Sequence, residues 1–287
     1  SFEMKIKIGT QGSRLALREA KAVAAGIVEH YPDIETEIMY IDTRGYEMIE
    51  RSFEKSGGGN IYTDRMEKAL LDGEIDIAVH SAKHLPLTLA AGTCISAVLE
   101  RSSPRDVLVT KRGAPLPDNM TVGTNSKRRA AGIKKLNPNA RIAGITGNID
   151  VRLRMLYDGQ YDGIVLGEAG ALRSGVMRDE RFDFAAISWK LLVPSACQGM
   201  IAVQSRIGEN NHIFGAINDE DTYRCYETER RAAEVLYSED LSSAGIYAYI
   251  SDGIITLTVT KDQQKILTDS APVTLRFALA ERLTGML

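Results

Sequence analysis

The sequence predicts two similar α/β domains with a cleft between them, followed by a small α+β domain. Three observations lead to this prediction: strand-like and helix-like segments alternate, their order repeats, and the pattern changes after Pro194. Alternation of this kind is typical of a mostly parallel sheet covered by helices. The 287 residues suffice for several cores. The expected boundaries are 1–100 with 199–217 for domain 1, 101–198 for domain 2 and 218–287 for domain 3.

The first predicted domain opens with a strand and a helix. Residues 4–9 have a strand-like pattern, and apolar residues then recur at helical spacing from Leu15 to Ile27. Ser13 stands where a helix N-cap is expected. The other elements expected here are a strand at 36–41, a glycine-rich loop at 56–60, a helix ending near residue 73, and strands at 76–79 and 93–99.

The second predicted domain repeats this order. Residues 121–126 form a strand followed by a cap, as the segment beginning at residue 4 does. An Asp-Gly-x-x-Asp stretch ends a helix and opens a strand at 72–76, and again at 158–162. Two matches in the same order indicate two similar domains, the first enlarged by the glycine-rich loop. A ligand would lie in the cleft, where strand ends and helix N-termini converge.

The segment after Pro194 has a different pattern. Residues 200–203 are strand-like and residues 222–237 are helical in spacing. Two strand-like segments, 246–250 and 254–259, then flank an Asp-Gly turn, and a helix is expected from about residue 272. These elements predict the small α+β domain.

Composition narrows the classes of function. The net charge of -3, from 35 Lys+Arg against 38 Asp+Glu, argues against a dedicated nucleic-acid binder. The three cysteines, Cys94, Cys197 and Cys225, have the spacing of neither a disulfide framework nor a metal site, so no metal is expected. Neither a membrane-spanning apolar stretch nor an apolar signal core is present. We therefore expect a cytoplasmic protein that does not bind membranes. A monomer is also expected.

Polar and cationic residues gather at several strand-to-helix junctions. Helix N-termini carry a partial positive charge, and arginine donates hydrogen bonds in pairs to carboxylate or phosphate. Each junction alone is more typical of helix caps and solvated cations, but their recurrence on two repeated domains favours an anionic ligand with several acidic groups. The residues are Thr10, Ser13 and Arg14; residues 80–84; Thr124, Ser126, Arg128 and Arg129; and Thr146, Gly147, Asn148 and Arg152.

Short motifs also follow one another in a specific order along the whole chain. They are Thr43-Arg44-Gly45, Lys55 with Gly57 and Gly58, His80-Ser81-Ala82-Lys83, Pro104-Arg105-Asp106, residues 123–129 and residues 194–199. In this set the chain resembles the porphobilinogen deaminase, or hydroxymethylbilane synthase, family. The resemblance implies a transferase of tetrapyrrole (porphyrin) biosynthesis, which condenses porphobilinogen head to tail into a linear tetrapyrrole and releases ammonia. It also implies a dipyrromethane cofactor held by a cysteine thioether in the third domain.

The resemblance further implies roles for single residues. Lys83 and His84 occupy the catalytic stretch, where proton transfer takes place. Arginines bind the acetate and propionate side chains of the pyrroles, which agrees with the cationic junctions described above. The substrate- or primer-binding positions are Ser13, Lys55, Thr124, Ser126, Arg128, Arg129, Arg152, Arg173 and Gln198.

The chain departs from the family pattern at the chemical centre. His84 replaces the catalytic aspartate; an imidazole exchanges protons near neutral pH but supplies no fixed negative charge. Asp240 replaces the cofactor-bearing cysteine, and a carboxylate forms no thioether. Cys197 is a weak alternative for attachment, because a thiol among apolar neighbours is more often a packing residue. Further departures that each remove a cation are Gln11, Gly59 and Thr146.

Three functions follow as alternatives. The first is a porphobilinogen-condensing transferase whose standard primer-dependent activity is weakened, absent or replaced. The second is a non-catalytic binder of a pyrrole or tetrapyrrole polycarboxylate in the same cleft. The third is a two-lobed solute-binding protein, because the predicted domains are like those of periplasmic binding proteins; the missing export signal counts against it.

Overall fold

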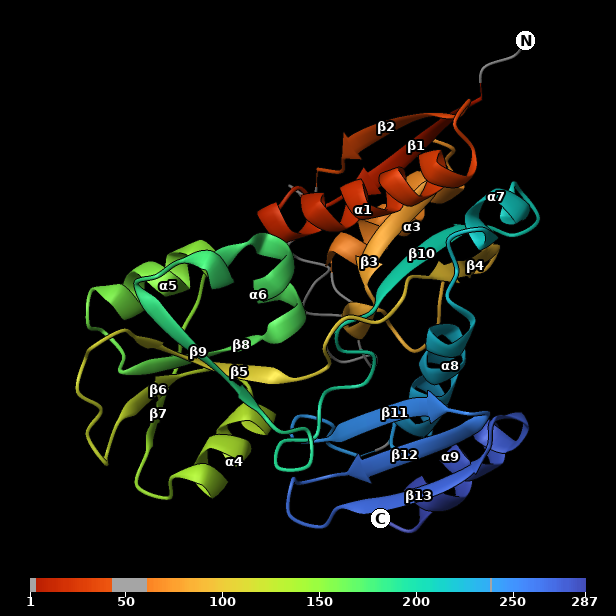
Figure 1. Cartoon of the computed structure of the whole chain (residues 1–287). Coiled ribbons are helices and arrows are strands. Elements are labelled where there is room, and N and C mark those ends of the chain that lie inside the picture. The colour runs from red at the N-terminus through yellow and green to blue at the C-terminus, as the bar shows by residue number, and fades with distance from the viewer. Residues whose placement is uncertain (1–3, 43–60, 238) are drawn as a thin grey trace. The chain divides into compact units, whose positions relative to one another are not determined.

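The structure of the chain is a computed structural model that describes residues 4–42, 61–237 and 239–287 (Figure 1). The chain divides into two compact units. Unit 1 contains residues 1–101 and 200–226, and unit 2 contains residues 102–199 and 227–287. The three-domain boundaries and the cleft that the sequence predicts stay predictions.

Unit 1 is built on a five-stranded sheet with the strand order β2-β1-β3-β10-β4. Strand β1 runs parallel to β2 and β3, whereas β10 runs antiparallel to β3 and β4. The elements are β1 (Lys5–Thr10), α1 (Arg14–His30), β2 (Glu35–Tyr40), α3 (Ile61–Leu71), β3 (Ile77–Ser81), the 3-10 helix η2 (Ala82–His84), β4 (Thr93–Val98), β10 (Ile201–Arg206), α7 (Asn211–Gly215) and α8 (Glu220–Val235), which continues into unit 2.

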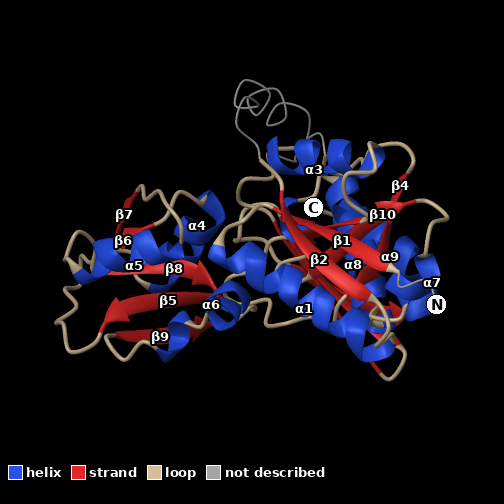
Figure 2. Ribbon diagram, turned by 90° about the horizontal axis from the view of Figure 1, so that it is seen from above, coloured by secondary structure: helices blue, strands red, loops and turns tan. Residues whose placement is uncertain are grey.

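Helices cover both faces of this sheet, as Figure 2 shows for α1 and α3. Because successive strand residues point to opposite faces, Ile77 and Val79 pack in one core cluster and Ala78 packs in another. The first cluster contains Val23 and Ile27 of α1, and the second contains residues of α3. The buried stripe of α1 therefore follows the apolar spacing in its sequence.

Unit 2 contains a second five-stranded sheet, with the order β7-β6-β8-β5-β9. Here β6 runs parallel to β7 and β8, and β5 runs antiparallel to β8 and β9. The spatial order and the directions of the strands match those of the unit 1 sheet, although β5 comes first along the chain in its sheet and β10 comes last in its own. The predicted pair of similar α/β folds is confirmed. The elements are β5 (Asp106–Lys111), β6 (Thr121–Gly123), α4 (Lys127–Leu136), β7 (Arg141–Ala143), α5 (Ile149–Tyr157), β8 (Gly163–Gly167), α6 (Glu168–Ser174), the 3-10 helix η3 (Val176–Arg178) and β9 (Phe182–Ile187).

The repeated Asp-Gly-x-x-Asp stretches make the same contact in both units. The Asp76 carboxylate accepts a hydrogen bond from the backbone N–H of Lys7 at 2.8 Å, next to β3 and β1. The Asp162 carboxylate accepts one from the N–H of Thr121, also at 2.8 Å, next to β8 and β6. In each unit the aspartate thus ties the start of one strand to its parallel neighbour, which is the physical reason that the repeat is visible in the sequence.

The rest of unit 2 is a three-stranded antiparallel sheet of β11 (Gly245–Ser251), β12 (Ile254–Thr260) and β13 (Leu267–Pro272). The 3-10 helix η4 (Val273–Leu275) and α9 (Arg276–Gly285) follow. The sequence placed a helix from about residue 272 and missed β13, because this strand exposes most of its side chains and lacks apolar alternation. The predicted α+β character of this part is confirmed.

Candidate ligand-binding site

Two helix N-termini meet at one edge of the unit 2 sheet. Helices α4 and α5 follow β6 and β7, which are parallel neighbours, so both helices begin at the carboxyl edge of the sheet. Ser126 caps α4 by accepting from the N–H of Arg129 at 3.1 Å, and Asn148 caps α5 by accepting from the N–H of Val151 at 3.0 Å. Thr124, at 4% exposure, accepts from the N–H of Ser126. Two partial positive charges therefore lie at this edge.

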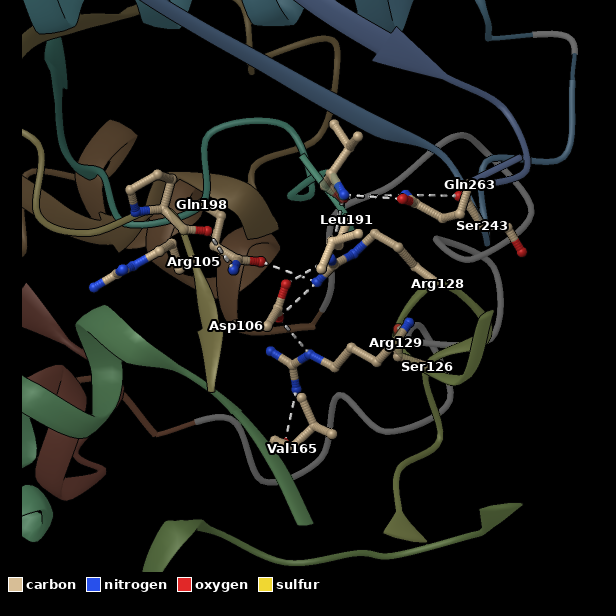
Figure 3. Close-up of polar contacts among 12 residues, drawn as sticks. Arg105, Asp106, Ser126, Arg128, Arg129, Val165, Leu191, Gln198, Ser243 and Gln263 are labelled. Carbon is tan, nitrogen blue, oxygen red and sulfur yellow. Dashed lines mark hydrogen bonds and ion pairs between the residues drawn. The ribbon is translucent and has the colours of Figure 1, made fainter. Parts of the chain in front are cut away.

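A buried ion cluster lies below the first turn of α4, where Asp106 binds two consecutive arginines (Figure 3). Arg128 donates from Nη1 and Nη2 to the two carboxylate oxygens, at 2.7 and 2.9 Å, and Arg129 donates from Nε at 2.8 Å. The side chains of Asp106, Arg128 and Arg129 are 0%, 3% and 13% exposed. Burial raises the pKa of Asp106, but the two arginines outweigh it and hold that pKa below its usual value.

Arg129 and Arg152 bring two guanidinium groups to the same edge. Burial is the largest cause that lowers the pKa of Arg129, Asp106 opposes it, and the charges of Arg128 and Arg152 lower it further. Arg152 lies on α5, donates from Nε to the carbonyl of Gly147 at 2.8 Å, and has its own pKa lowered by burial. Two like charges in a partly desolvated place favour a bound anion that neutralises them.

Gln198 and Arg173 are placed in the same unit by contacts with the backbone. Gln198 accepts from Nη2 of Arg128 at 3.2 Å and donates to the carbonyl of Pro104 at 2.8 Å. Arg173 donates to the carbonyl of Gly199 at 3.0 Å. Gln198 is therefore joined to the buried ion cluster through Arg128. Arg173 instead contacts the backbone of Gly199.

The loop before β11 contains Asp240, at the position where the family resemblance implies a cysteine. Its carboxylate accepts from the N–H of Ser242 at 3.0 Å; the hydrogen bonds from Ser242 lower the pKa of Asp240, and the charge of Lys127 adds to this. The carbonyl of Ser242 in turn accepts from the N–H of Arg128. This loop is therefore joined to the first turn of α4, and its residue 240 is an exposed carboxylate.

None of the three cysteines lies in the loop before β11. Cys197 is 1% exposed, and its N–H donates to Glu229 at 2.7 Å. Cys225 is 4% exposed in α8, and Cys94 is half-buried in β4.

In unit 1, the predicted residues lie after β1 and β3. Ser13 caps α1 by accepting from the N–H of Ala16 at 3.1 Å. Lys83 and His84 form the exposed end of η2, directly after β3. His84 lines a pocket of about 20 Å³ together with Gln11, His80 and Ser81, among others. Two positions that depart from the family pattern, residues 11 and 84, thus share one pocket. Lys55 and Gly59 lie outside the described residues.

A buried polar network lies beside this pocket, and the sequence did not reveal it. The Nε2 of Gln204 donates to Glu67 and Thr93 at 2.8 and 3.0 Å. Its Oε1 is therefore an acceptor, so His80 donates to it through Nε2 at 2.8 Å. Burial lowers the pKa of His80 from 6.5 to about 4, and the hydrogen bond with Gln204 opposes this shift. His80 is neutral in the folded protein at neutral pH.

His80 should make the fold sensitive to acid. The unfolded chain binds a proton at His80 near pH 6.5, whereas the folded protein does so only near pH 4. The contribution of neutral His80 to the free energy of unfolding is fully present above pH 6.5. It declines by about 3 kcal/mol as the pH falls toward 4. Equilibrium unfolding of wild type and His80→Gln between pH 7 and 4 measures this difference. The exposed His30→Gln variant should follow wild type; parallel curves for His80→Gln and wild type would contradict the assignment.

Asp106, Glu229 and Gln263 are further residues that the sequence reasoning did not assign to the site. Gln263 is fully buried, has a left-handed backbone with φ 66°, and exchanges hydrogen bonds with the backbone of Val193. Glu229 is fully buried and accepts from the N–H groups of Cys197 and Ala248. An isolated carboxylate beside an apolar stretch is the signal that could have indicated Asp106, because such a group needs a partner when buried.

Among the residues that the structure describes, no group of three or more His, Cys, Asp or Glu could hold a metal ion. No helix in the described ranges is long and apolar enough to cross a membrane.

The fold and this edge define a class of protein: a doubled α/β protein in which two helix N-termini and two arginines gather at one sheet edge. Residues 6–213 match the family model described as porphobilinogen deaminase, dipyromethane cofactor binding domain. The chain is 39% identical over 230 residues to a porphobilinogen deaminase of Syntrophomonas wolfei, covering 78% of this chain and 74% of that protein. It is 36% identical over 256 residues to one of Acetivibrio thermocellus, covering 89% and 87%. The chain belongs to the porphobilinogen deaminase family, as its motifs predict.

Two solved structures are similar at lower identity. The VFT2 domain of Bordetella pertussis BvgS matches with a TM-score of 0.43 and 16% identity, over 82% of this chain and 92% of that chain. An ancestral arginine-binding protein bound to arginine matches with a TM-score of 0.39 and 16% identity, over 78% and 96%. At this level of similarity neither match bears on function.

Proposed function

We propose that this protein is a transferase of the porphobilinogen deaminase type, which joins porphobilinogen units head to tail and releases ammonia. The observation that carries the proposal is the pair of guanidinium groups, Arg129 and Arg152, at the N-termini of α4 and α5. Each pyrrole unit of the substrate carries an acetate and a propionate. Carboxylates of this kind suit arginine donors and helix N-termini.

The residues of the chain do not fit a thioether-bound dipyrromethane. Thioether attachment needs an accessible thiol, and the loop before β11 presents the carboxylate of Asp240 instead. Cys197 and Cys225 are buried, and Cys94 is half-buried in a sheet strand of unit 1. We therefore propose that pyrroles are held here by ionic and hydrogen-bonding contacts alone.

His84 is the proposed proton-transfer group. In each condensation a carbon–nitrogen bond breaks to release ammonia, a carbon–carbon bond forms between pyrroles, and one proton leaves the attacked ring carbon. An exposed imidazole can accept and return such a proton. Lys83 is proposed to add positive charge beside it. A cytoplasmic, monomeric state stays a prediction.

The experiment combines two measurements on the purified chain. Porphobilinogen is added, ammonia release is followed, and the intact mass of the denatured protein is recorded before and after. We expect ammonia release and an unmodified mass. Absence of ammonia release would contradict the transferase, whereas a mass increase equal to pyrrole units would contradict non-covalent retention and identify an attachment residue by peptide mapping.

Arg154→Ala is the control variant for the proposed ligand arginines, Arg129 and Arg152. Arg154 is exposed on α5, two residues from Arg152. This variant should release ammonia as wild type does, because its side chain points to solvent.

A further inference from the structure

Arg128 and Arg129 are neighbours in the sequence, but the structure gives them different surroundings. We propose that Asp106 is a positioning residue that binds Arg128 into the fold and aims the guanidinium of Arg129 at a ligand carboxylate. This inference rests on the proposed function, because the ligand is a pyrrole carboxylate. It assigns different roles to two arginines that are neighbours in the first turn of one helix.

The two terminal nitrogens of the Arg128 guanidinium are saturated by acceptors of the protein itself. Nη1 donates to Asp106 and to the carbonyl of Val193, at 2.7 and 3.1 Å. Nη2 donates to Asp106 and to Gln198, at 2.9 and 3.2 Å. Nε is buried and has no acceptor within the described part of the chain. A ligand could bind either terminal nitrogen of Arg128 only by breaking a bond of this buried cluster (Figure 3).

The guanidinium of Arg129 is fixed in orientation but not saturated. Nε donates to Asp106 at 2.8 Å and Nη1 donates to the carbonyl of Val165 at 3.2 Å. These two contacts define the plane of the group. Across residues 4–42, 61–237 and 239–287, no side chain or carbonyl accepts from its Nη2 within hydrogen-bonding distance. The Nη2 of this preoriented guanidinium can therefore donate to a ligand carboxylate.

Asp106 is itself held rigidly. It is the first residue of β5 and pairs with Gly167 of β8 and Ile187 of β9. Both carboxylate oxygens are used: Oδ1 accepts from both arginines, and Oδ2 accepts from Arg128. In either orientation of an asparagine amide, at least one guanidinium N–H of this pair would face the amide NH2 group, and the negative charge that holds both guanidinium groups would be lost. The substitution therefore weakens the cluster that orients Arg129 while it keeps the volume of the side chain.

The test compares Asp106→Asn with Glu168→Gln. Glu168 is also buried and paired with an arginine, Arg105, at 2.8 Å, but it has no contact with Arg129 among the interactions described. Porphobilinogen binding is measured by calorimetry, and KM and kcat by ammonia release. For Asp106→Asn we expect affinity to fall about tenfold or more and KM to rise by the same factor, with kcat per folded molecule little changed. Asp106→Glu should recover part of the affinity.

A purely structural role would give a different pattern. It would lower the melting temperature and the folded fraction of Asp106→Asn, while the KM of the folded molecules stayed at the wild-type value. That result would overturn the proposal. So would an Arg128→Lys variant that loses as much affinity as Arg129→Lys.

A third measurement needs no ligand. Proton–nitrogen NMR of the arginine Nε–H groups reports the hydrogen bond from Arg129 to Asp106, whose signal should move in Asp106→Asn and stay in Glu168→Gln. An unmoved signal would contradict the positioning role even if porphobilinogen binds. If the signal moves but wild type neither binds nor converts porphobilinogen, the proposed function fails while the contact between Asp106 and Arg129 stands.

Discussion

Replacement of Asp106 by alanine should lower the free energy of unfolding by about 3–5 kcal/mol, because it leaves two buried guanidinium charges without their counter-ion. Arg128 would keep only the neutral acceptors Val193 and Gln198. Equilibrium denaturation of the whole chain, followed by circular dichroism, measures the difference. This is the largest stability effect that we expect from a single polar side chain in unit 2.

Asp183→Ala is the matched control for this prediction. Asp183 also pairs with an arginine, Arg112 at 3.1 Å, but both side chains are more than half exposed. Loss of such a surface pair should cost less than about 1 kcal/mol. If Asp106→Ala unfolded at the same denaturant concentration as Asp183→Ala, the buried cluster would not have the stabilising role that its geometry indicates.

Removal of both proposed ligand arginines should nearly abolish pyrrole binding. In Arg129→Ala/Arg152→Ala, we expect porphobilinogen affinity to fall about 100-fold or more, since each charged hydrogen bond contributes about 1.5–3 kcal/mol. Calorimetric titration of the folded protein measures the loss. The single variants divide it between the two arginines.

Salt dependence provides an independent measure of the same site. Wild-type affinity should decrease as the salt concentration rises, and the double variant should show a weaker dependence, because fewer charges are neutralised on binding. Arg154→Ala should retain the affinity and salt dependence of wild type. Unchanged affinity in the double variant would exclude this edge of unit 2 as the carboxylate site.

The repeated α/β pattern could be predicted from the sequence because its signals are local. Strand-to-helix junctions, the caps at Ser13 and Ser126, and the paired aspartates at 76 and 162 each lie within a few residues of what they organise. Strand β9 and strand β13 were not expected. Many of their side chains are exposed, so no apolar alternation marks them.

The cations at this edge of unit 2 could be predicted from residue type, but the different surroundings of Arg128 and Arg129 could not. Sequence reasoning expects Arg128 and Arg129 to act together, since both are cations in the first turn of one helix. Their difference depends on Asp106, more than twenty residues earlier, and on the carbonyls of Val165 and Val193, more than thirty residues later. These partners are brought together by the packing of strands against helices. A local sequence pattern does not contain that information.

The position of β10 in the unit 1 sheet has a consequence for the order in which the chain folds. β10 lies between β3 and β4, yet it is synthesised only after the whole α/β sheet of unit 2. On the ribosome, β4 has no partner in its sheet until residue 201 has emerged, and β3 keeps one unpaired edge. The strands of the second sheet are continuous in sequence, so this sheet can form first. Until β10 has been synthesised, the unpaired strand edges of unit 1 are prone to wrong pairing.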